Sequence, residues 1–270
     1  MIQLLALAAI LAASGPASAR APHAADRRPV RSGTMARIAG GTYRPLYAAA
    51  GDAPVHVAAF ALDRMPVTRG DFLAFVRANP SWRRSAVRPA VAGRGYLANW
   101  AGDLDAGDAT DRRRPVTAVS WFAGKAYCES LGKRLPTLDE WEFAAAASET
   151  RADATRDPRF VRRLLALYAQ RPSGGVLPPV GAGFRNVHGV RDLHGGAWEW
   201  TLDFNGAAAA HDAHDPARRG IAHEHMPSCA SAAIGATDQT NYPSFLRFAF
   251  RAALSSQSTV LTLGFRCAGA

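Results

Sequence analysis

PVTAVSWFAGKAYCESLGKRLPTLDEWEFAA, residues 115–145, contains the start and stop signals of two consecutive helices. Ser120 can cap the N-terminus of the first helix, and Gly132 suits the left-handed position just after its end. Thr137 can cap the second helix, and Glu140 three residues later completes a capping box. We therefore predict two helices with a short, well-defined connection between them.

Short elements are expected on the N-terminal side of this stretch. Residues 35–47 read as two strands around a glycine turn, and residues 55–68 alternate well enough for a further strand. Thr68 then suits the N-cap of a helix over 69–79, whose apolar residues fall on one face. Residues 80–111 lack clear periodicity and are expected to form long ordered loops.

The C-terminal half is less regular in its pattern. Residues 160–170 have an apolar pattern like that of a helix. Residues 186–205 are rich in aromatic residues and interrupted by glycines, which is more typical of a loop. We interpret 244–254 and 262–270 as two strands with a loop between them. The sequence therefore predicts a mixed α/β (α+β) domain with little regular secondary structure.

The composition is that of a globular domain with an excess of arginine. Of 270 residues, 48% are hydrophobic and the formal net charge is +10, so the chain is long enough and apolar enough for one large packed domain. The arginines are scattered in short groups and are not interleaved with aromatic residues along one element. This pattern disfavours nucleic-acid binding.

The N-terminus predicts export. Residues 1–19 combine an apolar run with an Ala-Ser-Ala cleavage site, although no basic residue precedes the run. The run is too short to be a membrane-spanning helix, which needs about 20 apolar residues. We expect a signal peptide over 1–19, a disordered linker over 20–33, one domain over 34–270, and a periplasmic location where disulfides persist.

Residues 211–229 gather soft metal ligands within a short segment. The candidates for a copper site are His211, His214, His223, His225, Met226 and Cys229. Imidazole, thioether and thiolate suit copper, but a solvated histidine-rich loop is the plainer interpretation. The chain has three cysteines, so one pair and one spare thiol are expected, and the sequence alone leaves three pairings open.

Several segments, in order, resemble the formylglycine-generating enzyme family, also called the sulfatase-modifying factor family. They are Gly40-Gly41-Thr42, FALDRMPVTRGDFLAFV (60–76), the opening stretch (115–145), NVHGVRDLHGGAWEW (186–200) and LGFRC (263–267). The resemblance implies that family's fold, which is related to C-type lectin domains. It also implies a disulfide between Cys128 and Cys267, which would leave Cys229 as the spare thiol.

A calcium site is also expected within this resemblance. Asp192 and Glu199 bracket an irregular backbone, and carboxylate and carbonyl oxygens are the ligands that Ca²⁺ prefers. The resemblance places the ligands at Asp192, the backbone oxygens of Gly195 and Ala197, and Glu199. The alternative is that Glu199 forms a salt bridge with an arginine.

The cysteine pair that performs the family's oxidase chemistry is missing. That chemistry uses a C-x-x-x-x-C pair that holds Cu(I), and this chain contains no such spacing. We therefore do not expect oxidation of a peptidyl cysteine to formylglycine by the family route. The cleft that the resemblance implies would lie near Trp198, Asn241, Arg247 and Arg251.

The segments YRPLY (43–47), NPSWRRS (79–85) and FLRFAFRAAL (245–254) further resemble an exported branch of the family that is associated with copper nitrite reductases. This resemblance implies a periplasmic accessory or maturation protein that binds a protein or peptide partner, and a periplasmic copper enzyme is the expected partner. The alternatives are an oxidoreductase with a His/Met/Cys metal centre, or a residual formylglycine-generating oxidase, so the sequence leaves open whether the chain is an enzyme.

Overall fold

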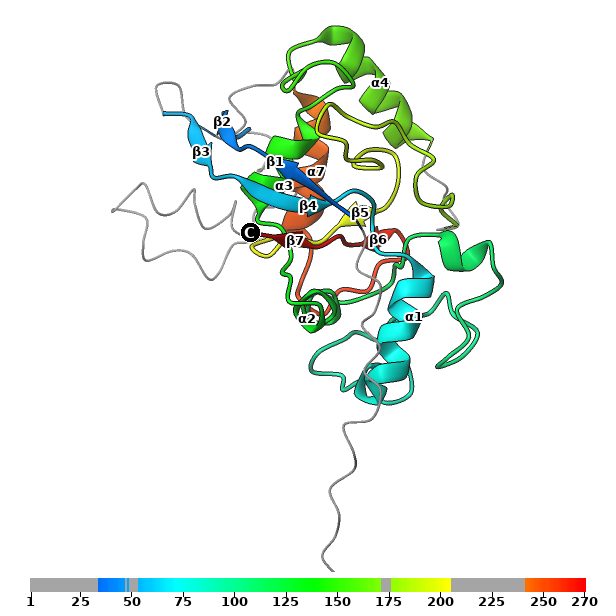
Figure 1. Cartoon of the computed structure of the whole chain (residues 1–270). Helices are drawn as coiled ribbons and strands as arrows, with labels where there is room; N and C mark the ends of the chain where they lie inside the picture. The colour runs from blue at the N-terminus through cyan, green and yellow to red at the C-terminus, as the bar shows by residue number, and fades with distance from the viewer. Residues whose placement is uncertain (1–33, 47, 49–52, 171–175, 205–240) are drawn as a thin grey trace, which may run out of the picture.

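The computed structural model describes residues 34–46, 48, 53–170, 176–204 and 241–270 (Figure 1). The elements are β1 (Met35–Ile38), β2 (Gly41–Tyr43), β3 (Val55–Val57), β4 (Phe60–Asp63), α1 (Arg69–Ala78), η1 (Pro80–Trp82), η2 (Asp111–Arg113), α2 (Trp121–Ser130), α3 (Leu138–Ala145), α4 (Pro158–Ala169), β5 (Trp198–Glu199), α7 (Tyr242–Ala252), β6 (Leu263–Gly264) and β7 (Ala268–Gly269). In the described part, no strand exceeds four residues. The fold is therefore mixed α/β with little regular secondary structure, as predicted.

The main sheet joins the two ends of the described chain. It has three strands in the order β1-β4-β7, and both pairings are antiparallel. Leu62 of β4 lies opposite Ala36 on one side and Ala268 on the other. A separate parallel pair aligns Trp198 of β5 with Leu263 of β6. The C-terminal residues thus pair with β4 in the main sheet and with β5 in the parallel pair.

The helix signals of the opening stretch act as predicted. The Ser120 side chain accepts a hydrogen bond from the backbone N–H of Ala123, and Gly132 has φ +69° just after α2. Thr137 and Glu140 form a reciprocal capping box at α3, and α1 begins with a capping box at Thr68. These local hydrogen bonds explain why the sequence located the starts of these three helices.

The strand prediction for 244–254 is wrong, because residues 244–252 lie in helix α7. The helix buries Ser244, Arg247, Phe248 and Arg251, which are the i, i+3, i+4 and i+7 positions of one helical face. Two of these four are arginines, so the buried face is not visible as a hydrophobic stripe in the sequence. Their carboxylate partner, Glu142, lies more than 100 residues earlier in the chain.

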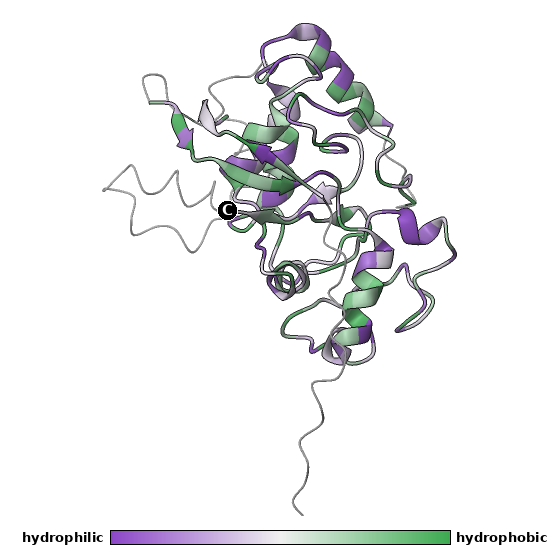
Figure 2. Cartoon of the chain, in the orientation of Figure 1, coloured by the Kyte–Doolittle hydropathy of each residue, from purple (hydrophilic) through white to green (hydrophobic). Residues whose placement is uncertain are grey.

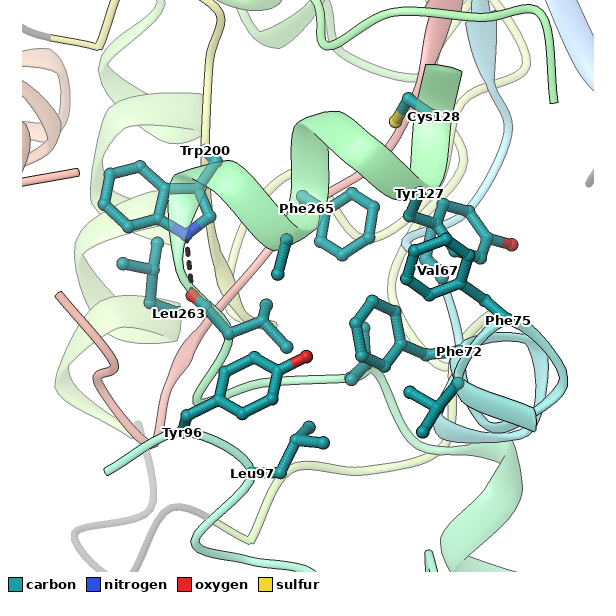
Figure 3. Packing of buried hydrophobic residues seen from close by; sticks show 14 of the residues in the cluster. Val67, Phe72, Phe75, Tyr96, Leu97, Tyr127, Cys128, Trp200, Leu263 and Phe265 are labelled. Carbon is teal, nitrogen blue, oxygen red and sulfur yellow. Dashed lines mark hydrogen bonds between the residues drawn. The ribbon is translucent and has the colours of Figure 1, made fainter. Parts of the chain in front are cut away.

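The largest hydrophobic cluster fills the space between α1, α2 and the C-terminal segment (Figure 3). Phe72 contacts Phe75, Tyr127 and Phe265, with ring centroids 5.3–6.1 Å apart. Trp200 closes the cluster and donates its indole N–H to the carbonyl of Val119, 2.9 Å away. Large aromatic rings thus anchor the long loops on the core.

Figure 2 shows that α1 and α4 each carry both hydrophobic and hydrophilic residues. This distribution is typical of helices with one buried face and one solvent face. In α4 the buried residues are Phe160 and Leu164. Across the described residues, no helix combines the length and hydrophobicity needed to cross a membrane. The predicted signal peptide (1–19) and linker (20–33) lie outside the described residues.

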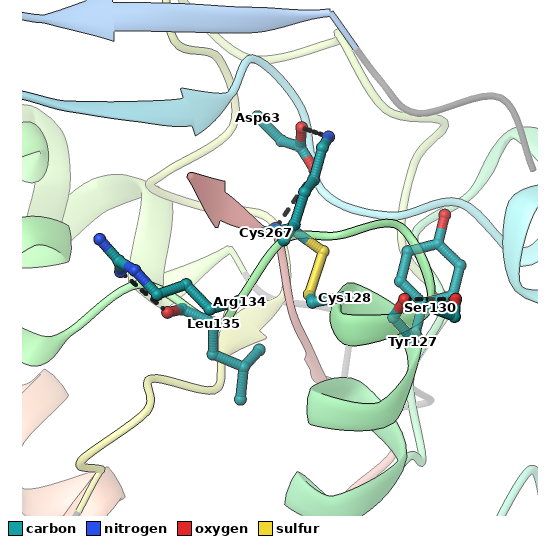
Figure 4. Close-up of a disulfide and its surroundings, with 8 residues drawn as sticks. Asp63, Tyr127, Cys128, Ser130, Arg134, Leu135 and Cys267 are labelled. Atoms are coloured by element: carbon teal, nitrogen blue, oxygen red, sulfur yellow. Dashed lines mark hydrogen bonds and ion pairs between the residues drawn. A yellow bond between two sulfur atoms is a disulfide. The ribbon is translucent and has the colours of Figure 1, made fainter. Parts of the chain in front are cut away.

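The disulfide implied by the family resemblance is present. Cys128 of α2 bonds to Cys267, with their Cα atoms 5.6 Å apart (Figure 4). A buried ion pair lies beside it, with Lys133 Nζ 2.6 Å from Asp63 Oδ1, and the other Asp63 oxygen accepts a hydrogen bond from the N–H of Cys267. The bond therefore links α2 to the C-terminal segment next to the main sheet.

Removing this disulfide should destabilise the protein markedly. It closes a loop of 139 residues, and loss of a native disulfide typically lowers the free energy of unfolding by about 2–4 kcal/mol. We expect a Cys128→Ala/Cys267→Ala variant to show that loss in urea unfolding, with Cys229→Ala as the unchanged control. An equal loss in Cys229→Ala would contradict this pairing.

Candidate functional site

Glu142 is a buried carboxylate held by two arginines of α7. It lies on α3, and its oxygens accept hydrogen bonds from Arg247 Nε (3.0 Å) and Nη2 (2.5 Å) and from Arg251 Nη1 (2.6 Å). All three side chains are about 5% exposed or less. Because an unpaired buried charge is strongly unfavourable, α3 and α7 depend on each other in this structure.

Burial alone would raise the pKa of Glu142, but the charges of Arg247 and Arg251 and their hydrogen bonds outweigh it. Together they lower the pKa of this carboxyl from 4.5 to about 2. Glu142 is thus ionised throughout the neutral and mildly acidic range. It serves as a fixed charge in the interior, and its depressed pKa makes it a poor proton acceptor near neutral pH.

Trp141 joins this triad to a second buried ion pair. The guanidinium groups of Arg247 and Arg251 lie 5.5 and 4.7 Å from the centre of its ring, a cation–π arrangement. Its indole N–H donates to Glu199 Oε2 at 2.8 Å. Glu199 is itself held by Arg266 through two hydrogen bonds of 2.7 and 2.8 Å. The ring of this tryptophan therefore has an electrostatic role as well as a packing role.

A chain of hydrogen bonds connects the triad to the buried side chain of His194. Arg247 Nη1 lies 3.0 Å from the hydroxyl of Tyr168, which lies 2.9 Å from Nδ1 of His194. His194 Nε2 lies 2.9 Å from the carbonyl oxygen of Ala145. Since a carbonyl only accepts, Nε2 carries the proton. In the neutral ring Nδ1 then accepts from Tyr168, so both ring nitrogens have partners.

A pocket opens beside His194. Its volume is about 170 Å³. The lining residues are Pro66, Pro115, Leu167, Pro178, Pro179, Val180, Ala182, Gly183, Asp192, His194, Gly195, Gly196 and Ala197. Most of them are apolar, and the only ionisable side chains among them are Asp192 and His194. The pocket therefore has mainly apolar walls, with one carboxylate and one histidine among the lining residues.

Asp192 is fixed by the neighbouring loop. Its carboxylate accepts hydrogen bonds from the backbone N–H groups of Gly181 and Gly183, and its backbone lies in the left-handed region at φ +61°. This conformation is uncommon for a residue other than glycine, although aspartate tolerates it better than most. Gly195, which also lines the pocket, has φ +78°, a backbone conformation that favours glycine, and a Cβ atom there would lie 3.1 Å from Leu167.

The described contacts do not fit the expected calcium site. Arg266 and Trp141 already occupy both oxygens of Glu199, which is the salt-bridge alternative considered from the sequence. Asp192 is held separately by Gly181 and Gly183. Gly195 and Ala197 do line the pocket with Asp192, but Glu199 does not. Calcium binding thus stays a prediction, and the contacts of Glu199 argue against a cation shared by the two carboxylates.

The four cleft candidates lie in one region but differ in exposure. Arg247 and Arg251 are buried in the triad, so they act inside the described structure and do not line an open cleft there. Trp198 is half-buried and stacks on Phe250 of α7 with centroids 4.6 Å apart. Asn241 caps α7 through a hydrogen bond from the N–H of Ser244.

The copper candidates cannot be placed, because the segment with His211, His214, His223, His225, Met226 and Cys229 lies outside the described residues. Within 34–46, 48, 53–170, 176–204 and 241–270, no group of three or more His, Cys, Asp or Glu side chains could hold a metal ion.

Comparison with known families matches residues 21–270 to the sulfatase-modifying factor enzyme 1-like domain. This chain belongs to that family. The match covers nearly the whole chain and agrees with the order of its motifs.

Three relatives place the chain within the sulfatase-modifying factor family. It is 28% identical to the formylglycine-generating enzyme of Streptomyces coelicolor, over 96% of both chains. It is 31% identical to the inactive C-alpha-formylglycine-generating enzyme 2 of Mus musculus, over 54% of this chain and 59% of that protein. Identity to the Bos taurus protein of the same name is 38% over 32% of each. The match thus spans only about a third to three fifths of these two mammalian relatives.

Glu142, Tyr168 and the proline walls of the pocket were not predicted from the sequence. Glu142 carried a usable signal, since it lies among apolar residues of a predicted core-facing helix, where a charged side chain implies a buried partner. Tyr168 and the prolines at 66, 115, 178 and 179 lie far apart in the sequence, and no short-range pattern links them. Only the folded chain brings them to His194 and Asp192.

Replacing Glu142 with glutamine should be strongly destabilising. Two buried arginines would lose their counter-charge, and breaking a buried ion pair on one side typically costs about 3–5 kcal/mol. The matched control is Glu149→Gln, since Glu149 pairs with Arg163 at the surface, where such pairs are worth about 1 kcal/mol or less. Equal losses in urea unfolding of the two variants would refute the central role of the triad.

The same triad should make stability pH-dependent in the acid range. The pKa of Glu142 is lower in the folded state (about 2) than its ordinary value of 4.5, so the folded state is favoured while the group is ionised. This stabilisation is complete above about pH 4.5 and is lost as the pH falls toward 2. Urea unfolding at stepped pH should show a steeper loss in this window for wild type than for Glu142→Gln, and parallel curves would count against it.

Proposed function

We propose that this chain is a non-oxidase member of the sulfatase-modifying factor family that acts as an exported accessory or maturation factor for a periplasmic enzyme, with copper enzymes as the expected partner class. The proposal rests on how many cysteine thiols of the chain remain free. Of three cysteines in the sequence, Cys128 and Cys267 are joined in a structural disulfide. Only Cys229 is left, and one thiol cannot supply the two-thiolate copper site of the oxidase route.

The relatives support a family in which the oxidase activity is not universal. Those that match this chain include proteins named formylglycine-generating enzyme and proteins named inactive C-alpha-formylglycine-generating enzyme 2. Loss of that chemistry is therefore compatible with retention of the fold. The long loops anchored by buried ion pairs and aromatic rings would serve as a rigid surface for binding a polypeptide.

The accompanying metal hypothesis concerns residues 211–229. The six soft ligands there would suit copper, and a bound copper would favour an oxidoreductase with its own metal centre over an accessory scaffold. Calcium at Asp192 is a separate proposal that needs no redox chemistry. Metal content of the purified protein therefore separates these possibilities.

The first test uses residues 20–270, purified from a periplasmic fraction without a histidine tag. We expect less than one copper per chain, and no aldehyde by mass spectrometry after incubation with Cu(I), oxygen and a cysteine-containing peptide. Formation of the aldehyde would overturn the proposal. One copper per chain, lost in a His223→Ala/His225→Ala/Cys229→Ala variant, would favour the metal-centre alternative.

The accessory role itself is tested in the source cell. Deletion of the gene for this chain should lower the copper occupancy of a periplasmic copper enzyme that depends on it, without changing that enzyme's transcript level. Restoring the wild-type chain or its Cys229→Ala variant should restore the occupancy. Unchanged occupancy of every periplasmic copper enzyme would contradict this partner class.

A further inference from the structure

We propose that a surface formed by two neighbouring loops binds an acidic segment of a partner protein. This inference rests on the proposed function, because it names the surface and the chemistry with which an accessory factor would hold its partner. We call it the arginine surface, and its exposed side chains are Arg88, Arg94, Val260 and Leu261.

The first observation is the one-sided charge of the two segments that meet here. Residues 72–102 contain five arginines and no acidic residue, and residues 241–270 contain no acidic residue either. None of those five arginines forms an ion pair in the described part of the chain. Asp103, the next acidic residue along the sequence, accepts hydrogen bonds from Ser85 through both carboxylate oxygens. Arg88 and Arg94 are thus exposed charges without a counter-charge among the described residues.

The second observation is that the two loops are joined. Gly93 donates its backbone N–H to the carbonyl of Gln257 at 2.9 Å. Gly95 lies so close to the other loop that a Cβ atom on it would be 2.9 Å from the hydroxyl oxygen of Thr259. Arg94 lies between these two glycines, so its backbone is held next to the loop that carries the exposed apolar pair.

The turn with Arg88 is attached to the same loop. The carbonyl of Arg88 accepts a hydrogen bond from the N–H of Val91 at 3.0 Å. Within this turn the carbonyl of Ala90 accepts one from the side-chain amide of Gln257 at 2.9 Å. Both arginines therefore belong to backbone that is fixed against residues 257–259, and they contribute to one surface.

The third observation is an apolar pair at a fixed position. Val260 and Leu261 are 37% and 43% exposed, and they are the only sequence neighbours among the large hydrophobic residues exposed in the described part. The carbonyl of Val260 accepts hydrogen bonds from the N–H groups of Ala118 and Leu263, at 3.1 and 3.0 Å. The backbone is thus held in place while two apolar side chains face solvent. Arginine is enriched at protein–protein interfaces, and their centres are more apolar than their rims.

The base of the surface contains strained backbone. Leu97 and Ala118 have φ +49° and +58°, a region that residues with a side chain seldom adopt. The N–H of Leu97 donates to the carbonyl of Ala118 at 2.8 Å, and Ala118 in turn donates to Val260. Such conformations persist only where the surroundings impose them, and they cluster at binding sites. The loops are therefore preorganised, which lowers the entropic cost of binding.

These features fit an acidic polypeptide better than a membrane. The planar guanidinium group of arginine matches the two oxygens of a carboxylate. Proteins that bind a membrane surface commonly insert the apolar face of an amphipathic helix, often with aromatic residues. Here the surface consists of loops, and its exposed apolar side chains are both aliphatic. We therefore assign to it a segment with several carboxylates around an apolar residue.

Binding is tested by fluorescence anisotropy with residues 20–270 and a labelled hexapeptide, Glu-Glu-Leu-Leu-Glu-Glu, blocked at its C-terminus. Two matched peptides carry glutamine in place of glutamate or serine in place of leucine. We expect the first peptide to bind about tenfold or more tightly than the glutamine peptide, and to weaken at about 0.5 M salt, because the attraction is electrostatic. The serine peptide should bind several-fold more weakly. Equal binding of the glutamate and glutamine peptides would overturn the proposal.

Two variants locate the binding on the arginine surface. Arg88→Glu/Arg94→Glu should weaken the glutamate peptide about tenfold or more, because two attractive charges become repulsive. Val260→Ser/Leu261→Ser should weaken it several-fold with no change in charge, which keeps the test valid if the first variant unfolds. Wild-type affinity in both variants would overturn the proposal.

The matched control is Arg159→Glu/Arg162→Glu, which makes the same change in net charge at two exposed positions of α4. It should bind the glutamate peptide like wild type. Equal weakening in this control and in Arg88→Glu/Arg94→Glu would show that only net charge matters, and would overturn the proposal. Binding to vesicles of phosphatidylglycerol and phosphatidylcholine without binding of the peptide would overturn it in favour of a membrane.

The outcome is separable from that of the proposed function. Absence of peptide binding together with absence of aldehyde and copper would leave a non-oxidase protein that uses another surface. Peptide binding that is lost in the two surface variants, together with aldehyde formation, would keep the arginine surface and overturn the non-oxidase function.

Discussion

The ion pair between Glu199 and Arg266 is the contact on which the rest of the structure depends. Both side chains are fully buried, which would be costly without close compensation. Arg266 donates to both oxygens of Glu199 and also to the carbonyls of Asp63 and Arg191. One guanidinium thus ties β5, the end of β4 and the loop before the pocket to the C-terminal segment.

This arrangement explains how a chain with so few strand hydrogen bonds can hold a defined pocket. Arg266 fixes the carbonyl of Arg191, the residue directly before Asp192. Trp141 also donates to Glu199, and its ring centre lies 4.7 Å from the guanidinium of Arg251 in the Glu142 triad. The loop around the pocket is therefore supported by two buried carboxylates, Glu199 and Glu142, that are each paired with arginine.

The fold was predictable wherever a local signal existed. Thr68, Ser120 and Thr137 each mark a helix start, because an N-cap side chain bonds to a backbone N–H a few residues away. Helix α7 was missed because its buried face includes Arg247 and Arg251. The spacing of apolar residues in the sequence cannot identify this helical face, because its arginines are buried only through their ion pairs with Glu142, which is distant in the sequence. The candidate site was likewise predicted only in part. Asp192 was identified from its sequence motif, whereas Tyr168 and the proline walls were not.

The sequence by itself determined the family, the helix boundaries near residues 115–145 and the absence of a spaced cysteine pair, since all three depend on residue types at short separations. Tertiary structure alone decided which charges are paired. Glu199 and Arg266 are 67 residues apart, and Glu142 and Arg247 are 105 apart. Contacts at such separations arise only when the chain folds, because Coulomb attraction between buried groups depends on distance in space and on exclusion of water.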